Sequence, residues 1–292
     1  MERIARALEL AQAEHPAEPL GIRRVITGDA AALAGRETVH VAERETPVVT
    51  ERPAAERTED TPLFGTRTVH PDRVSFEHER VLPPGASGAQ GASYKLLRTQ
   101  VLQRLDQLGA STLAILSAAE AEGKTLTAIN LAIAVAAELG RTALLVDFDL
   151  RNPNVHRRLG FEPTVGVEAC LQSGRPVQEA LVRLAGYPRL SVLPARDKVE
   201  HSSELVGSQR AASLVNELRT RYSDRIVIFD LPPVLHSDDA LAFSRLVQAG
   251  LFVIAERRTQ RDELASSLTL LRELPIIGTV LNGSREPVRA YY

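Results

Sequence analysis

Two carboxylates one residue apart are the side chains of this sequence whose spacing points most directly to chemistry. Asp147 and Asp149 follow the apolar residues 144–146, and Arg151 follows them at the same interval. Side chains at i and i+2 of a strand point to the same face, so both carboxylates face one way if the strand persists to Asp149. A Gly-Lys-Thr loop at 123–125 precedes them. Together these residues predict a phosphate site that needs a metal ion.

Residues 115–126 have the order strand, loop, helix that a nucleotide phosphate loop requires. Loop amides and the start of the helix would point their positive ends at phosphate oxygens. We expect Lys124 to reach the β- and γ-phosphates of ATP, and the Thr125 hydroxyl to bind Mg²⁺. The predicted nucleotide-binding residues of the loop are Ala121, Glu122, Gly123, Lys124, Thr125 and Leu126.

The loop departs from the pattern G-x-x-x-x-G-K-[ST] at its beginning and middle. Ala118 stands at the first glycine, and Ala121 stands where glycine would ease the approach of the backbone. Glu120 and Glu122 add two negative charges beside a polyphosphate. Two interpretations remain open: a loop that binds nucleotide with lowered affinity, or a decayed loop that keeps the fold without turnover.

Three aspartates, Asp147, Asp149 and Asp230, each follow a predicted strand. Ligands of open α/β sheets bind at the carboxyl ends of strands. We expect Asp230 to hold Mg²⁺ directly or through water, and Asp147 to orient an attacking hydroxyl or water and accept its proton. Asp149 either shares in holding the metal or is a solvated strand end. Arg151 pairs with these carboxylates, binds phosphate, or is a solvated surface arginine.

These roles give two predicted sets. The predicted catalytic residues are Lys124, Asp147 and Asp149, and the predicted metal ligands are Thr125, Asp147 and Asp230.

From about residue 90 onward, strands and helices alternate. Apolar runs predict strands at 112–116, 142–147, 190–193, 225–230, 251–255 and 276–281. Helical spacing predicts helices at 94–108, 124–139, 167–172, 177–184, 203–222, 237–247 and 261–274, the last with a capping box on Thr259 and Asp262. Continuous apolar strands are typical of a parallel sheet covered on both faces. The predicted fold class is α/β: a doubly wound, mainly parallel sheet flanked by helices, of the P-loop NTPase type, after a largely disordered N-terminal region.

Composition divides the chain into four predicted parts. Residues 1–14 have the spacing of a short amphipathic helix that either docks or frays. Residues 15–88 are rich in proline and charge, which favours a flexible linker. Residues 89–285 form the predicted ATP-binding domain, which the resemblance described below identifies as kinase-like, and 286–292 form a flexible tail that ends in two tyrosines.

The overall composition limits the classes of function. A net charge of −2 gives no electrostatic case for binding nucleic acid or a polybasic grip on membranes. The single cysteine, Cys170, excludes an internal disulfide framework and suits a reducing cytosol. The charged start is unlike a signal peptide, and no apolar run is long enough to span a bilayer. We therefore expect a cytoplasmic protein without a direct membrane span.

Residues 92 to about 284 resemble the bacterial tyrosine kinase (BY-kinase) family of the capsular exopolysaccharide type, which is related to partition and Min ATPases. The matching segments, in order, are 117–118 with 123–125, 145–153, 203–205, 230–235 with 239–240, and 278–283. The resemblance implies an ATP-dependent protein-tyrosine autokinase that regulates exopolysaccharide or capsule biosynthesis or export.

The same resemblance implies acceptors and partners. Tyr291 and Tyr292 would receive phosphate, in the family usually within a neighbouring subunit, so self-association is expected. A membrane polysaccharide co-polymerase or adaptor would be the partner, recruiting the protein to the inner face of the membrane. Asn282 matches an asparagine that contacts adenine in related ATPases, and a strand-end turn residue is an equal interpretation.

The sequence departs from related families at two places, one of which bears on the branch of the family and the other on oligomerisation. Ala119 stands where partition and Min ATPases carry a signature lysine, which favours the kinase branch. The family's Glu-x-x-Arg-x-x-Arg oligomerisation motif falls on Ala92, Lys95 and Arg98, which puts a closed kinase ring in doubt. The alternatives are an ATP-binding regulatory switch of polysaccharide assembly, a structural scaffold that has lost nucleotide chemistry, and a partition or Min-type ATPase.

Overall fold

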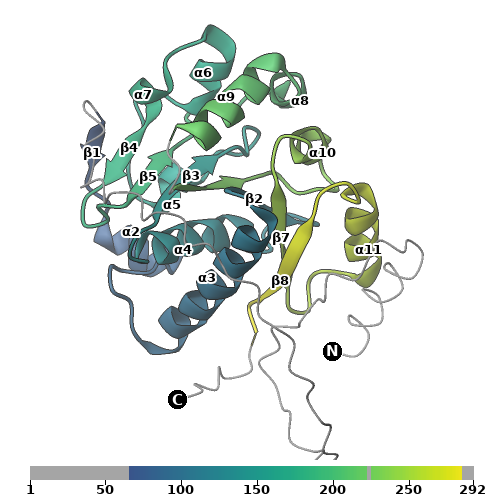
Figure 1. Cartoon of the computed structure of the whole chain (residues 1–292), viewed down its shortest axis with the longest axis horizontal. Helices are drawn as coiled ribbons and strands as arrows, with labels where there is room; N and C mark the ends of the chain where they lie inside the picture. The colour runs from purple at the N-terminus through teal and green to yellow at the C-terminus, as the bar shows by residue number, and fades with distance from the viewer. Residues whose placement is uncertain (1–65, 222–224, 285–292) are drawn as a thin grey trace, which may run out of the picture.

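The computed structural model describes residues 66–221 and 225–284, which are built around one eight-stranded sheet (Figure 1). The strands are β1 (Arg67–Val69), β2 (Thr112–Ser117), β3 (Thr142–Asp147), β4 (Val182–Leu184), β5 (Leu190–Leu193), β6 (Arg225–Asp230), β7 (Ala249–Ala255) and β8 (Ile276–Asn282). Their order across the sheet is β1-β4-β5-β3-β6-β2-β7-β8. Only the β4–β5 pair is antiparallel among the described strands, so the central strands bring their carboxyl ends to one edge.

Helices cover both faces of this sheet. They are α2 (Arg73–Glu79), α3 (Gly88–Leu108), α4 (Lys124–Ala136), α5 (Val155–Arg158), α6 (Val167–Ser173), α7 (Val177–Ala180), α8 (Ser202–Val206), α9 (Gln209–Thr220), α10 (Asp239–Ser244) and α11 (Arg261–Leu270). Helices α3 and α4 lie across the sheet from α6 and α9 (Figure 1).

The two core layers follow from alternation along each strand. In β2, Leu113 and Ile115 join the cluster that contains α3 and α4, whereas Ala114 and Leu116 join the cluster that contains α9 and α10. All four side chains are fully buried. A strand buried on both faces must be apolar throughout, which is why the sequence shows continuous apolar runs. The predicted doubly wound, mainly parallel sheet is confirmed.

The segment 66–88 differs from the predicted flexible linker, because it is folded onto the sheet. Strand β1 pairs with β4, and Phe76 of α2 is buried. The Asn130 side chain of α4 accepts a hydrogen bond from the Leu82 amide at 2.8 Å and donates one to the Arg80 carbonyl at 3.1 Å. Paired backbone and a few buried apolar side chains therefore hold this segment despite its polar composition.

Several element boundaries also differ from the predictions. The predicted helix 177–184 ends at Ala180, and its last residues form strand β4. The predicted helix 203–222 is two helices, because Ser208 caps a new start by accepting a hydrogen bond from the Ala211 amide. The capping box of α11 uses Gln260 and Glu263, one residue later than predicted.

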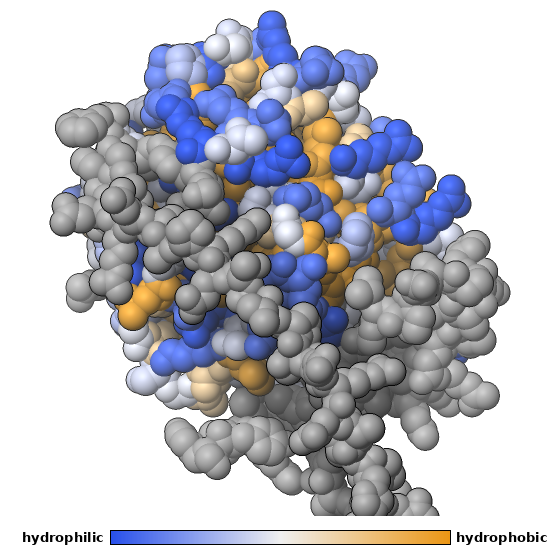
Figure 2. Space-filling model, in the orientation of Figure 1, coloured by the Kyte–Doolittle hydropathy of each residue, from blue (hydrophilic) through white to orange (hydrophobic). Residues whose placement is uncertain are grey.

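Some predictions lie outside the described residues. These are the helix at 1–14, the linker up to residue 65, and the tail 286–292 with Tyr291 and Tyr292. Within the described ranges, no helix has the length and apolar character needed to cross a bilayer. Hydrophilic and apolar residues interleave over the described surface on the face shown in Figure 2.

Candidate active site

The phosphate loop connects β2 to α4 at the carboxyl edge of the sheet. Helix α4 begins at Lys124, and Lys124 and Thr125 are both largely buried. Gly123 has a φ of 92°, and an added Cβ would lie 1.8 Å from Nδ2 of Asn282. Ala121 also has a positive φ, 57°, a region where residues other than glycine are strained. The sequence pattern correctly marked position 121 as one where glycine is favoured.

Lys124 lies between two of the three predicted aspartates. Its Nζ is 3.1 Å from Oδ2 of Asp149 and 3.6 Å from Oδ1 of Asp230. Burial alone would lower the pKa of Lys124, but the charges of Asp230 and Asp149 raise it above its usual value. The lysine therefore stays charged, and it links the strand ends of β3 and β6.

Asp147 is the last residue of β3 and is fully buried. Its Oδ2 accepts hydrogen bonds from the amides of Asn154 and Val155, both at 3.0 Å, and its Oδ1 accepts one from the Asp149 amide at 3.3 Å. Burial, with the nearby Asp230 charge, raises the pKa of Asp147 well above its usual value. Asp147 thus holds the start of α5 in place.

Asp149 lies beyond the end of β3, so the two carboxylates do not share one strand face. The chain turns after Phe148, and the Asn152 amide donates to Oδ1 of Asp149 at 3.1 Å. Asp149 lines a cleft of about 280 Å³ together with Lys124, Thr125 and the phosphate loop. The structure therefore brings Asp149, more than Asp147, to the surface of the site.

Three aromatic side chains fix the positions of these carboxylates from the opposite side. Phe148 packs edge-on against Phe229, with ring centroids 6.0 Å apart, and both pack on Phe243 of α10 at 4.4 and 4.9 Å. All three are fully buried. Each aspartate adjoins one of these rings in the sequence, so packing of the rings holds the acidic strand ends rigidly.

The carboxylate of Glu122, a residue that lines the cleft, is held by an amide of its own loop and by a hydroxyl far along the chain. Its carboxylate accepts a hydrogen bond from the Ala119 amide at 3.0 Å and another from the Thr259 hydroxyl. Asn282, at the end of β8, donates from Nδ2 to the Glu122 carbonyl at 2.9 Å. The expected repulsion between Glu122 and a polyphosphate is therefore reduced, and Asn282 supports the loop.

Arg151 pairs with a carboxylate other than those expected for it from the sequence, and it also lines the cleft. Its Nε and Nη2 approach the two carboxylate oxygens of Asp239 at 3.3 and 3.1 Å, and Nη2 also donates to Ser203 at 3.0 Å. Asp239 is 1% exposed and accepts a further hydrogen bond from Ser202. Arg151 therefore joins the end of β3 to α8 and α10.

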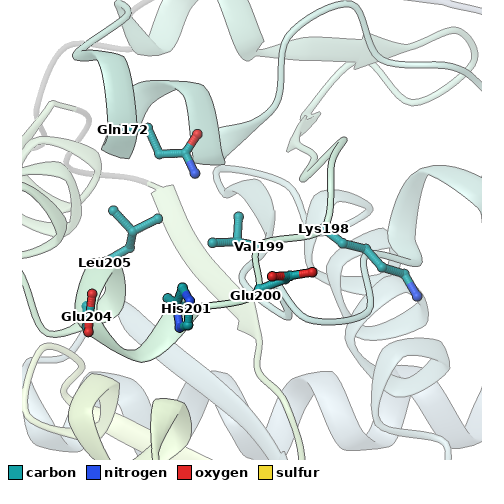
Figure 3. A pocket seen from close by; sticks show the side chains of 7 residues that line it. All are labelled: Gln172, Lys198, Val199, Glu200, His201, Glu204 and Leu205. Atoms are coloured by element: carbon teal, nitrogen blue, oxygen red, sulfur yellow. The ribbon is translucent and has the colours of Figure 1, made fainter.

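A larger hollow of about 450 Å³ lies beside this network (Figure 3). It is lined by the loop 198–201, by α8 and by Gln172 of α6, and its charged side chains include Lys198, Glu200 and Glu204. None of the phosphate-loop residues or site aspartates lines it. The smaller cleft, which contains Lys124 and Asp149, is therefore the candidate active site.

The structure adds two residues that the sequence did not place at the site. Arg158 lines the phosphate cleft, and Thr259, which the sequence assigned to a helix cap, holds Glu122 from a position far along the chain. Arg158 belongs to no recognisable motif, and the capping-box pattern at Thr259 gives no sign of its contact with Glu122. The predicted adenine contact of Asn282 and the predicted roles of the site residues stay predictions.

No family model matches the chain. A curated relative, the tyrosine-protein kinase YwqD of Bacillus subtilis, is 30% identical over 194 residues, which cover 66% of this chain and 80% of YwqD. The chain belongs to the bacterial tyrosine kinases. The family predicted from the motifs at 117–125, 145–153 and 230–235 is confirmed, and so is the tyrosine kinase as the class of function.

Two further similarities describe the kinase family more widely. The kinase domain of the Escherichia coli tyrosine kinase ETK superposes with a TM-score of 0.61 at 25% identity, covering 69% of this chain and 79% of that one. The succinoglycan biosynthesis transport protein ExoP of Rhizobium meliloti is 31% identical over 177 residues. That match covers 58% of this chain but only 22% of ExoP, so it concerns one part of a much longer protein.

Proposed function

We propose that this protein is an ATP-dependent protein-tyrosine kinase that phosphorylates its own C-terminal tyrosines and regulates exopolysaccharide or capsule assembly. The observation that carries the proposal is the Lys124 ammonium held between Asp149 and Asp230 at the end of a phosphate loop. Family membership supports the kinase chemistry. The printed name of ExoP, which concerns succinoglycan biosynthesis and transport, supports the connection with polysaccharide.

Each residue of the cleft has a role that its geometry suits. Lys124 neutralises phosphate oxygens and orients the transferred phosphoryl group. The role of proton acceptor, expected from the sequence for Asp147, moves in this proposal to Asp149, which lines the cleft and would accept a hydrogen bond from the acceptor phenol and take up its proton. Asp147 keeps α5 and the turn after β3 in position through its three backbone hydrogen bonds.

The residues at the strand ends suit a magnesium ion. Oδ1 of Asp230 is buried, has no hydrogen-bond donor among the described residues, and lies 3.6 Å from the Lys124 ammonium. The Thr125 hydroxyl lies close enough to the Asp230 carboxylate to help lower its pKa. No group of three or more His, Cys, Asp or Glu side chains within 66–221 and 225–284 could hold a metal alone. Phosphate oxygens would therefore complete the ligand set, as is usual for Mg²⁺. When bound, Mg²⁺ supplies charge stabilisation for the transferred group.

Partner and location belong to the same proposal. The protein would act in the cytoplasm beside a membrane polysaccharide co-polymerase, with acceptor tyrosines Tyr291 and Tyr292 presented to the cleft of a second copy.

Phosphosite mapping after incubation of the purified protein with ATP and Mg²⁺ tests this function. We expect phosphotyrosine at Tyr291 or Tyr292, and none in the Lys124→Ala variant. A protein that binds ATP but forms no phosphotyrosine would contradict the kinase and favour a second candidate, an ATP-binding switch. The positive φ of Ala121 motivates that candidate, because strain in the loop can weaken turnover more than it weakens binding.

A further inference from the structure

Arg158 is a cation of the phosphate cleft without an assigned role. It is the last residue of α5, whose first amides are gripped by Asp147. Residues four apart share a face of a helix, and Asn154 and Arg158 both line the cleft. The segment 149–158, which begins with Asp149, supplies several of the residues that line the cleft. Arg158 is therefore a cation on the same segment as the carboxylate proposed to receive the phenol proton.

The donors of Arg158 are only partly used. Nη1 lies 2.5 Å from Oε2 of Glu79, whereas Nε is buried and makes no hydrogen bond with the described residues. Arg151, the other arginine of the cleft, donates hydrogen bonds from Nε and Nη2 to Asp239 and Ser203. Because Nε is buried and Nη1 is held by Glu79, Nη2 is the nitrogen of Arg158 left to donate to a ligand in the cleft. Of the two guanidinium groups, Arg158 is the better placed to bind an anion.

Glu79 reaches Arg158 from the segment that precedes the phosphate loop in the sequence. It ends α2, and the next turn is bonded to Asn130 of α4, the helix that begins with Lys124. The side chains of Glu79 and Arg158 are 30% and 28% exposed, so their attraction adds little to folding stability. The pair instead restricts the directions in which the guanidinium can point.

We propose that Arg158 binds the terminal phosphate of the nucleotide, and that Glu79 is the residue that positions it. The inference rests on the proposed function, because it assumes that the cleft binds ATP. It assigns a phosphate-binding residue outside the phosphate loop. It also makes the segment 66–88 part of the nucleotide site.

Nucleotide binding by Arg158 variants tests the first half. Arg158→Ala should weaken ATP binding about tenfold, the loss of one charge-assisted contact, while ADP binding changes by less than about twofold. Arg158→Lys, which keeps the charge but loses the planar fork, should give an intermediate loss for ATP. Arg157→Ala is the matched control, because Arg157 is exposed on the same helix, does not line the cleft and carries the same charge.

Glu79 variants test the second half. Glu79→Gln should lower the ratio of ATP to ADP affinity about threefold, whereas Glu77→Gln, exposed on the same helix, should leave it unchanged. In the Arg158→Ala background, Glu79→Gln should have no further effect, because it acts through Arg158. A purely structural role for Glu79 would lower both affinities together and would add to the effect of Arg158→Ala.

Two results would overturn the inference: equal losses of ATP and ADP affinity in Arg158→Ala, or no loss of either. Failure of the proposed function would give a different experimental result. If the wild type binds ATP but makes no phosphotyrosine, the kinase proposal fails while the ATP-to-ADP ratio still decides the role of Arg158. If the wild type binds no nucleotide, both proposals are wrong.

Discussion

Replacing Ala121 by glycine should stabilise the protein and strengthen nucleotide binding. Ala121 has a φ of 57°, and its methyl group is exposed, so removing that group loses no packing. The left-handed region costs a residue with a Cβ about 1–2 kcal/mol. Glycine also raises the conformational entropy of the unfolded chain, which reduces the stabilisation by about 0.4–1 kcal/mol. The net gain is about 0.5–1 kcal/mol.

Thermal unfolding and calorimetric titration with ATP measure this gain. For a domain of this size, about 1 kcal/mol corresponds to a rise of about 2–4 °C in Tm. ATP affinity should rise as well, because a loop without strain is better organised before binding. The rate of phosphotyrosine formation is a second readout, and it should not fall.

Ala118→Gly is the matched control, since the phosphate-loop pattern requires glycine at position 118, whereas position 121 is one of its variable positions. Ala118 is fully buried and is absent from the described residues with positive φ. Glycine there should therefore destabilise the protein, by about 0.5–1 kcal/mol from chain entropy and more from the lost methyl. A stabilising Ala118→Gly or a destabilising Ala121→Gly would refute the reasoning that backbone conformation, and not the motif, decides where glycine is needed.

Three other changes have outcomes fixed by the structure. Gly123→Ala should abolish ATP binding and lower Tm, because the new Cβ would clash with the Asn282 side chain. Calorimetric titration should show that ATP affinity is partly restored in the double variant Gly123→Ala/Asn282→Gly. Burial raises the pKa of Glu168 above 4.5 despite the amide hydrogen bonds from 196 and 197, so its contribution to stability is present below pH 4.5 and lost as pH rises through the folded pKa. In urea unfolding, the free energy of unfolding of Glu168→Gln should therefore rise relative to that of the wild type between pH 4.5 and 7. A difference between the two proteins that does not change with pH would contradict this. Burial raises the pKa of Cys170 to about 11, so a thiol reagent at pH 8 should react only as the protein unfolds; fast labelling of folded protein would refute it.

The main elements and the acidic strand ends could be predicted because they depend on local patterns. Continuous apolar runs predicted β3 and β6 with the residues that the structure gives them. Once these strands are parallel neighbours, Asp147 and Asp230 must lie together, and they are paired in register. The kinase family followed from the same motifs.

The division of work between the carboxylates could not be predicted, because it depends on where strand pairing ends. Strand β5 pairs with β3 only as far as Val146, and β6 ends opposite Asp147. Beyond that point the chain is free to turn, which buries Asp147 against backbone amides and leaves Asp149 at the cleft. A two-residue spacing in the sequence does not show whether the strand continues.

The fold of the segment 66–88 could not be predicted from the sequence, for a different reason. Its fold depends on a few separated apolar residues and on the Asn130 side chain, 48 residues away from Leu82. The average composition of such a segment is polar, so it resembles that of a flexible linker. Long-range hydrogen bonds of this kind leave no periodic signal, so only the structure places Glu79 beside Arg158.

The contacts around Ala121 bear on whether the phosphate loop has decayed. A strained residue persists only where its surroundings fix the backbone. Here Arg258 donates to the Ala121 carbonyl at 3.2 Å, Asn282 holds the next carbonyl, and the Glu122 side chain ties the loop to Thr259. A loop kept only for folding would have no need of a conformation that alanine resists, and substitutions elsewhere would relax it. Maintenance of the strained shape by three distant residues therefore favours a loop that still binds nucleotide.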